Sequence, residues 1–283
     1  MTQAVSVKAN GAVSAPQGAA MAPDATPPQG ATTSPDTAKP QGASISAGFW
    51  DEVYSTNPIY SKELSDEARE AIQAAAAWFG DLSGKTVLDL GCGAGASSLL
   101  LAEIGADVIS VDASPVAIAS LTERCRARGV TRVRPVVCDA MTIDTLGPVD
   151  FVYGSMILHH LEPFGEFCQA LRRTIRPGGR AFFWENNAAS DLLLWFRKHV
   201  VGKLWVPKYG DEHEFPLTPS EIATLRGVFE VTTEHPRMEF FALASLYLLR
   251  GRLMKPMAAI DDFLFRHDIG TRYSYQQYVR VQG

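Results

Sequence analysis

The sequence predicts an α/β domain in which a doubly wound, mostly parallel sheet of seven strands carries helices on both faces. Three observations predict this fold. Strand and helix patterns alternate once order begins near Phe49, the strand segments are short apolar runs, and apolar residues recur at helical spacing between them. Apolar strands that alternate with helices are typical of a parallel sheet covered on both faces, and right-handed crossovers then wind it in both directions.

Serine, threonine and proline mark the starts of the expected helices. Ser65 is expected to cap the first helix, because serine caps helix starts and two acidic residues follow it. Ser114 followed by Pro115 begins a later helix in the same way. Thr218 and Glu221 form a capping box at the start of the last one. The helices expected from these signals cover residues 65–79, 96–104, 114–128, 164–175 and 218–225.

Seven apolar or alternating runs are expected to form the strands. They cover residues 85–90, 107–111, 133–137, 149–153, 180–184, 228–234 and 274–281. A turn at Pro177-Gly178-Gly179 is expected before the fifth strand. Two apolar segments, at about 188–217 and 237–268, interrupt the pattern, and we expect them to form a lid or substrate region.

Residues 1–46 differ in composition from the rest of the chain. They contain four charged residues and no aromatic residue, and the tetrapeptide Pro-Gln-Gly-Ala recurs at Pro16, Pro28 and Pro40. Such a segment cannot bury enough apolar surface to offset the entropy lost on ordering. We therefore expect a disordered low-complexity tail, followed by one domain over residues 47–283.

Bulk properties exclude several classes of protein. The formal net charge of −5 argues against a nucleic-acid partner, because nucleic-acid-binding domains usually carry a basic face. The four cysteines form no C-x-x-C pair, so reduced thiols are expected and no metal is assigned. No secretory signal is recognised at the N-terminus, which favours a cytoplasmic location.

A glycine loop follows the first expected strand. Gly91, Gly93 and Gly95 lie between that strand and a helix, where glycines permit a tight turn and the close approach of a ligand to the backbone. Asp112 ends the next strand, 21 residues after Gly91, and a carboxylate there can accept both hydroxyls of a ribose. The pattern predicts a nucleoside-containing cofactor across the ends of these strands.

The loop has the form G-x-G-x-G and is preceded by Asp89. This combination resembles motif I of the class I S-adenosylmethionine-dependent methyltransferases of the small-molecule type. The segment from Asp150 to Ser155 and the turn Pro177-Gly178-Gly179 resemble further motifs of that family, in the family's order. The resemblance covers roughly residues 50–283. It implies a Rossmann-like methyltransferase fold, S-adenosyl-L-methionine as the cofactor, and methyl transfer to a small acceptor.

The resemblance also implies the cofactor-binding residues. Those expected to bind S-adenosylmethionine are Asp89, Gly91, Gly93, Gly95, Asp112, Ala113, Asp139, Ala140 and Ser155. Asp139 matches the acidic residue that contacts the adenine amine, and Ala113 matches a residue beside the adenine ring. Tyr54 and Tyr60 are candidates to cover the cofactor, with simple core packing as the alternative.

Two adjacent histidines follow the fourth expected strand. A hydroxyl nucleophile must lose its proton, and histidine is the usual base. His159 resembles the catalytic histidine of small-molecule O-methyltransferases, so it is the first candidate base and His160 the second; a structural hydrogen-bonding role is the alternative for both. Glu185, Asn186 and Asn187 end the fifth strand, where they either line the substrate site or form a turn.

The acceptor is expected to be hydrophobic. The stretches 192–207 and 240–260 combine large apolar side chains with arginine and lysine and contain no acid. A packed lid with snorkelling cations is one interpretation, and an entry that tolerates a lipid surface is the other. O-methylation is slightly favoured, and a membrane-associated quinone or phospholipid methyltransferase is the alternative.

Two hypotheses from other classes remain open. A nicotinamide-dependent oxidoreductase would need a glycine at position 96, where this chain has Ala96. A cofactor-binding partner subunit without catalysis is the non-enzymatic alternative, and the intact fourth-strand segment argues against it.

Overall fold

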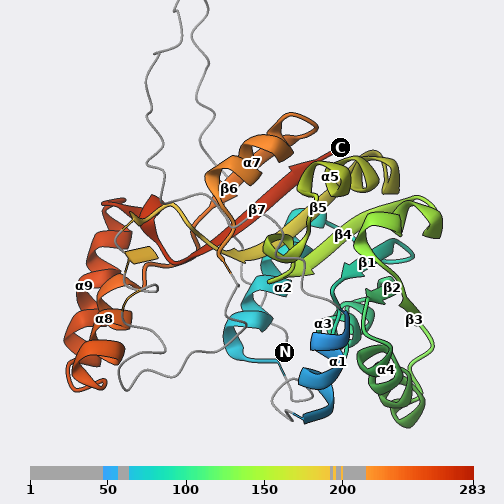
Figure 1. Cartoon of the computed structure of the whole chain (residues 1–283), viewed down its shortest axis with the longest axis horizontal. Coiled ribbons are helices and arrows are strands. Elements are labelled where there is room, and N and C mark those ends of the chain that lie inside the picture. The colour runs from blue at the N-terminus through green and yellow to red at the C-terminus, as the bar shows by residue number, and fades with distance from the viewer. Residues whose placement is uncertain (1–46, 57–63, 192–193, 196–198, 200–214) are drawn as a thin grey trace, which may run out of the picture. The chain divides into compact units, whose positions relative to one another are not determined.

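The computed structural model describes residues 47–56, 64–191, 194–195, 199 and 215–283 (Figure 1). The expected tail at 1–46, Tyr60 and most of the apolar stretch at 192–207 therefore lie outside the described residues. The description begins with a helix that the sequence analysis did not expect.

Three of the described helices begin at a residue whose side chain caps the first turn. Ser65 and Ser114 each accept a hydrogen bond from the backbone N–H three residues further on, as expected from the sequence. Thr218 and Glu221 form the expected capping box. The helices are α1 (Ala47–Thr56), α2 (Asp66–Phe79), α3 (Ala96–Glu103), α4 (Pro115–Arg128), α5 (Phe164–Thr174), α7 (Pro219–Arg226), α8 (Phe240–Leu249) and α9 (Met254–Arg266). Short 3₁₀ turns cover η2 (Ala140–Leu146), η3 (Leu158–His160) and η4 (Thr271–Tyr273).

The strands form one seven-stranded sheet of order β3-β2-β1-β4-β5-β7-β6. They are β1 (Thr86–Leu90), β2 (Asp107–Asp112), β3 (Val133–Val137), β4 (Val149–Ser155), β5 (Ile175–Asn186), β6 (Glu230–Glu234) and β7 (Gln276–Gln282). Strands β1 to β5 pair in parallel, whereas β7 runs antiparallel to both β5 and β6. The order reverses between β1 and β4, and in a doubly wound sheet ligands bind at the carboxyl edge beside such a switch point.

One expectation about local structure was wrong. The segment Pro177-Gly178-Gly179 is not a turn before the fifth strand but lies inside β5, where the register against β4 shifts. A Cβ atom at Gly179 would lie 2.6 Å from the carbonyl oxygen of Asp150, so glycine permits the close approach of the two strands. The apolar insertion between the last two strands, to which the sequence assigned no secondary structure, forms the helical hairpin of α8 and α9.

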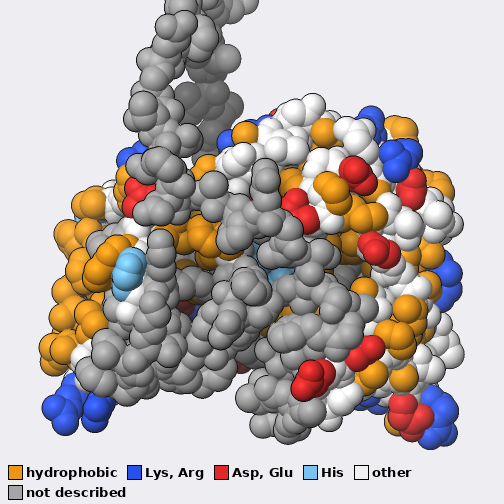
Figure 2. Space-filling model, viewed as in Figure 1, with side chains coloured by type: hydrophobic (Ala, Val, Ile, Leu, Met, Phe, Trp, Pro, Cys, Tyr) orange, Lys and Arg blue, Asp and Glu red, His pale blue; other side chains and the backbone are white. Residues whose placement is uncertain are grey.

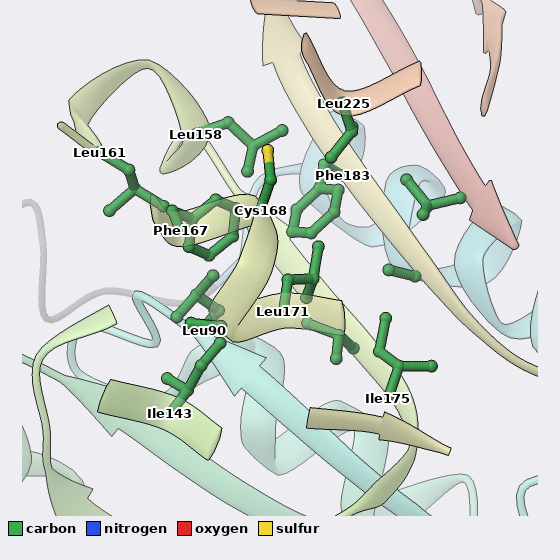
Figure 3. Packing of buried hydrophobic residues seen from close by; sticks show 14 of the residues in the cluster. Leu90, Ile143, Leu158, Leu161, Phe167, Cys168, Leu171, Ile175, Phe183 and Leu225 are labelled. Atoms are coloured by element: carbon green, nitrogen blue, oxygen red, sulfur yellow. The ribbon is translucent and has the colours of Figure 1, made fainter. Parts of the chain in front are cut away.

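Each face of the sheet carries a separate hydrophobic core. Side chains of β1 alternate between the two faces: Leu88 and Leu90 pack with α5 and α7, whereas Val87 packs with α2, α3 and α4. Figure 3 shows Phe167 and Leu171 of α5 reaching toward Leu90 and Phe183 from the sheet. Because both faces are buried, the carboxyl edge of the sheet is the place where a pocket can open.

Replacing Gly95 with alanine should destabilise the domain by about 2–4 kcal/mol. Gly95 caps α3 with φ +78° and ψ +26°, and a Cβ atom would lie 2.1 Å from Leu121 Cδ1 of α4. The left-handed conformation and the overlap each cost about 1–2 kcal/mol or more. Gly129 is the matched control, because it has nearly the same backbone angles but open space around it. Equal losses for Gly95→Ala and Gly129→Ala in denaturant unfolding would contradict the packing argument.

Candidate functional site

A cavity of about 620 Å³ opens at the carboxyl edge of β1, β2 and β4, beside the switch point of the sheet. Its size lies within the range of small-molecule sites. It is lined by Trp50, Tyr54, Leu90, Gly91, Val111, Asp112, Ala113, Cys138, Asp139, Ala140, Met141, Ser155, Met156, Ile157, His160, Leu161 and Glu162. The structure thus brings together seven of the expected site residues: Gly91, Asp112, Ala113, Asp139, Ala140, Ser155 and His160.

The glycine loop forms the floor of the cavity next to β1. Gly91 lines the cavity with φ +66°, a conformation that glycine adopts without strain. Gly93 lies under α1, since a Cβ atom on it would lie 2.7 Å from the hydroxyl oxygen of Tyr54. Gly93 and Gly95 therefore shape the loop and its packing, and only Gly91 of the three lines the cavity.

Asp112 ends β2 with its carboxylate at the cavity wall. Its two oxygens accept hydrogen bonds from the backbone N–H groups of Gly93 and Ser114, both at 2.9 Å. Burial raises the pKa of Asp112, and these hydrogen bonds oppose the rise. Each carboxylate oxygen has two lone pairs, so the group can accept further donors from the cavity.

Asp139 lies at the start of η2 and lines the cavity. Its carboxylate caps η2 by accepting a hydrogen bond from Met141 N at 2.8 Å. The side chain is exposed, and both Asp139 and Ala140 line the cavity. With Glu162, three carboxylate side chains line the cavity, and Asp112 and Asp139 are acceptors for hydroxyl or amino donors.

Asp89 points away from the cavity toward α3. It is 1% exposed, and one of its oxygens accepts hydrogen bonds from the hydroxyls of Ser97 and Ser98 at 2.7 and 2.5 Å. The expectation that Asp89 touches the cofactor is therefore not supported by its position; the side chain anchors the first turn of α3 to β1.

The burial of Asp89 predicts a dependence of stability on pH. Burial raises its pKa to about 6, whereas an unfolded aspartate titrates near 3.9. The folded state then binds the proton more tightly, so the contribution to stability is complete below about pH 4 and is lost as the pH rises through about 6. Relative to wild type, Asp89→Asn should gain roughly 2–3 kcal/mol in unfolding free energy between pH 4 and pH 7.

The matched control for this titration is Asp150→Asn. Burial raises the pKa of Asp150, but hydrogen bonds from Thr86 N and Arg176 outweigh it and lower the pKa overall. Its contribution is therefore fully present above the unfolded pKa of about 3.9 and is lost only as the pH falls below it, so Asp150→Asn should run nearly parallel to wild type between pH 4 and pH 7. The measurement is urea unfolding of both variants across this pH range; parallel curves for wild type and Asp89→Asn would contradict the assignment.

The two histidines differ in their surroundings. His159 is 2% exposed and does not line the cavity; its Nδ1 lies 2.6 Å from Glu185 Oε2. His160 lines the cavity, and its ring packs edge-on against Trp50 with centroids 5.5 Å apart. Of the two histidines, His160 is therefore the one whose side chain borders the cavity.

Glu185 fixes the segment that carries both histidines. It is fully buried, and its Oε1 accepts hydrogen bonds from the backbone N–H groups of Ile157 and Leu158 at 2.8 and 2.7 Å. Together with the contact to His159, three hydrogen-bonding groups of one segment converge on one carboxylate. Glu185 therefore holds the cavity wall in place without lining the cavity.

Asn187 has the structural role that the sequence analysis left open. Its amide nitrogen donates to the carbonyl oxygens of Arg272 and Ser274, and its side-chain oxygen accepts from Ala189 N. It joins the end of β5 to the chain before β7 and does not line the large cavity.

Several cavity residues were not expected from the sequence. Met156 follows β4 with φ +52°, an uncommon conformation for a residue other than glycine. Strained backbone of this kind clusters at functional sites. Ile157 and Leu161 continue the same wall, and Trp50 of α1 also lines the cavity. Tyr54 of α1, a candidate from the sequence to cover the cofactor, lines it too.

The expectation that the segment at 237–268 belongs to a lid or substrate region stays a prediction, and the described cavity does not support it. None of the residues that line it belongs to α8 or α9. Phe241 is half-buried. Leu246 is 47% exposed and therefore faces away from the core. These helices need a different explanation.

Comparisons with known proteins agree with the fold. The model of a family described as "Methyltransferase domain" matches residues 87–179. The chain is 27% identical over 212 residues to a ubiquinone biosynthesis O-methyltransferase from Bordetella avium, covering 74% of this chain and 86% of the relative. A relative of the same name from Paraburkholderia xenovorans is 29% identical over 62% of this chain and 74% of its own length.

Solved structures share the fold at low sequence identity. The [4+2]-cyclase SpnF superposes with a TM-score of 0.57 at 17% identity, covering 83% of this chain and 94% of that one. The N-methyltransferase NodS from Bradyrhizobium japonicum, solved with S-adenosyl-L-homocysteine, gives 0.51 at 15% identity, covering 84% and 97%. At these identities the likeness shows the fold alone.

The fold and the matched domain define a class I, Rossmann-like methyltransferase domain. With the curated relatives, they identify the chain as an S-adenosylmethionine-dependent methyltransferase. Its cofactor is S-adenosyl-L-methionine, which agrees with the carboxylates and the glycine backbone at the cavity.

Proposed function

We propose that this enzyme transfers the methyl group of S-adenosylmethionine to a hydroxyl of a small, hydrophobic acceptor in the cavity at the carboxyl edge of the sheet. The observation that carries the proposal is the placement of His160 in a cavity whose nearby wall is apolar. Ubiquinone biosynthesis O-methyltransferases are among the relatives by sequence, which favours an oxygen acceptor.

One end of the cavity has the chemistry that the cofactor requires. Asp112 is an acceptor for the ribose hydroxyls, and Asp139 is an acceptor for the adenine amine. Gly91 leaves its backbone open to the ligand, and Ala113, Ala140 and Ser155 complete this end. S-adenosylmethionine supplies an activated methyl group on sulfur, so the protein has to align it with the acceptor and exclude water.

The other end of the cavity fits an apolar acceptor. Met156, Ile157 and Leu161 form an apolar wall after β4, and Trp50 approaches from α1. His160 and Glu162 are polar groups next to this wall. A neutral imidazole can take the proton of an acceptor hydroxyl as the oxygen attacks. Glu185 acts on this step as a positioning residue, because it fixes the backbone of the segment that carries His160.

The same features bear on the alternatives. Membrane-associated quinones and phospholipids carry apolar chains, which the apolar wall accommodates. A partner subunit without catalysis would need no base in the cavity, and the position of His160 argues against it. We further propose that residues 1–46 form a tail that the domain at 47–283 does not need, so deleting residues 2–45 should leave cofactor affinity unchanged.

The test is transfer of labelled methyl groups to a panel of small acceptors. The panel pairs hydrophobic phenols and catechols with their aniline analogues and with equally sized polar phenols. We expect transfer to the hydrophobic phenols, with mass spectrometry locating the methyl on oxygen. Transfer to the anilines alone would overturn the choice of atom, and tight binding of S-adenosylhomocysteine without any transfer would favour the partner subunit.

A further inference from the structure

The helical hairpin of α8 and α9 exposes large apolar side chains that the methyltransferase cavity does not use. The members that are 40–52% exposed are Leu246, Leu248, Leu249, Leu253, Ile260 and Phe263. In Figure 2, hydrophobic side chains gather over these helices at the left edge of the molecule. Single exposed leucines are ordinary on protein surfaces, but a cluster of this size is typical of an interaction surface.

The sequence of α9 places its exposed apolar residues on one stripe. Leu253, Pro256, Ile260 and Phe263 follow one another at intervals of three or four residues, so they share one side of the helix. Lys255 and Arg266 are exposed and three helical turns apart, so both lie on another side, which they share with the exposed acid Asp262. An apolar stripe beside a charged side is the pattern of helices that lie in a membrane interface.

The turn between the two helices is strongly cationic. Arg250, Arg252 and Lys255 are all exposed, and residues 240–260 contain no aspartate or glutamate. Asp261, the first acid after them, is buried and accepts hydrogen bonds from Phe241 N and Ala242 N at the opposite end of α8. Its carboxylate is therefore engaged at the end of α8 away from the turn. Figure 2 shows Lys and Arg side chains at the lower end of the apolar patch.

We propose that this hairpin tip, the last turn of α8 with the first turn of α9, docks on an anionic lipid surface. Leu248, Leu249 and Leu253 would enter the boundary between head groups and acyl chains, while the three cations lie against lipid phosphates. Among the described residues no helix is both long and apolar enough to cross a bilayer, so the contact is made from one side.

Charge complementarity selects the lipid surface over a second copy of the chain. A symmetric contact through the tip would bring the like charges of Arg252 and Lys255 from both copies together. An anionic bilayer offers opposite charge to both. The proposal goes beyond the acceptor assigned above and does not rest on it, because no residue of the tip lines the cavity.

Co-sedimentation of the full chain with vesicles tests the proposal. We expect binding to phosphatidylcholine vesicles that contain about one third phosphatidylglycerol, weaker binding to pure phosphatidylcholine, and a loss of binding as salt rises, because salt screens exposed charges. Replacing Arg250, Arg252 and Lys255 with glutamine should weaken binding to the anionic vesicles by about tenfold or more, since each cation near the surface contributes. Leu249→Ser with Leu253→Ser should weaken it as well.

The matched control removes the same charge elsewhere. Replacing Arg128, Arg172 and Arg226 with glutamine changes three exposed cations on α4, α5 and α7 and should leave vesicle binding within about twofold of wild type. Calorimetry with S-adenosylhomocysteine checks that every variant is folded. No binding of wild type to anionic vesicles, or an equal loss in the control, would overturn the proposal. A dimer in analytical ultracentrifugation that Leu249→Ser with Leu253→Ser abolishes would overturn it in favour of a second copy.

Discussion

Replacing Asp112 with alanine is expected to weaken the binding of S-adenosylhomocysteine by about 10- to 150-fold. The variant loses charge-assisted hydrogen bonds to the ribose, which are worth about 1.5–3 kcal/mol. It also loses the acceptor for Gly93 N, the hydrogen bond that ties the glycine loop to the end of β2. The measurement is isothermal calorimetry of both proteins at one pH.

Two comparisons separate the ribose contact from the loop contact. Wild type should bind S-adenosylhomocysteine more tightly than its 2′-deoxyribose analogue, and Asp112→Ala should bind the two alike, because the cycle isolates the pairwise term. Asp107 lies at the other end of β2, exposed and paired with Arg132, so Asp107→Ala is the control and should keep full affinity. If Asp112→Ala still discriminates between the two ligands, the ribose hydroxyls are held by another residue.

The parts of the fold that follow from local chemistry could be predicted from the sequence. Helix caps are decided by one or two side chains, and the caps at Ser65, Ser114 and Thr218 are present as expected. Helix α1 was missed although Trp50 and Tyr54 stand at helical spacing, because a short segment beside a low-complexity tail gives a weak periodic signal. The uniformly apolar α8 was missed because it has no polar face to reveal a period.

The site could be predicted only as far as the carboxyl edges of the strands. Residues at strand ends, such as Asp112 and Ser155, reach the cavity because parallel strands present their carboxyl ends at one edge. Whether a neighbour such as Asp89 faces the cavity or a helix depends on the strand's alternation and on partners far along the chain. Which of the two histidines borders the cavity could not be predicted for the same reason, since the buried ring of His159 contacts Glu185, 26 residues further along the chain.

Replacing His160 with alanine or glutamine should lower kcat by about 10²- to 10⁴-fold on a hydroxyl acceptor. Removal of the acceptor proton is the step that a general base accelerates, and effects of this size are typical of one. The affinity for S-adenosylhomocysteine should change little, because the cofactor carboxylates Asp112 and Asp139 remain in place. Steady-state kinetics with the best acceptor of the panel, together with calorimetry, measures both quantities.

His159→Gln is the comparison that distinguishes a base from a merely structural histidine. His159 is adjacent to His160 but is buried against Glu185 and does not line the cavity. Breaking that buried contact should lower the free energy of unfolding by about 1–3 kcal/mol, whereas His160→Gln should keep the stability and lose the rate. A nitro group lowers the pKa of a phenol, so a larger fraction of the acceptor is already deprotonated at neutral pH. The loss of rate in His160→Gln should therefore be smaller with a nitrophenol. An unchanged loss on the acidic phenol would mean that His160 orients the acceptor, and a full rate in His160→Gln would remove the base from the mechanism.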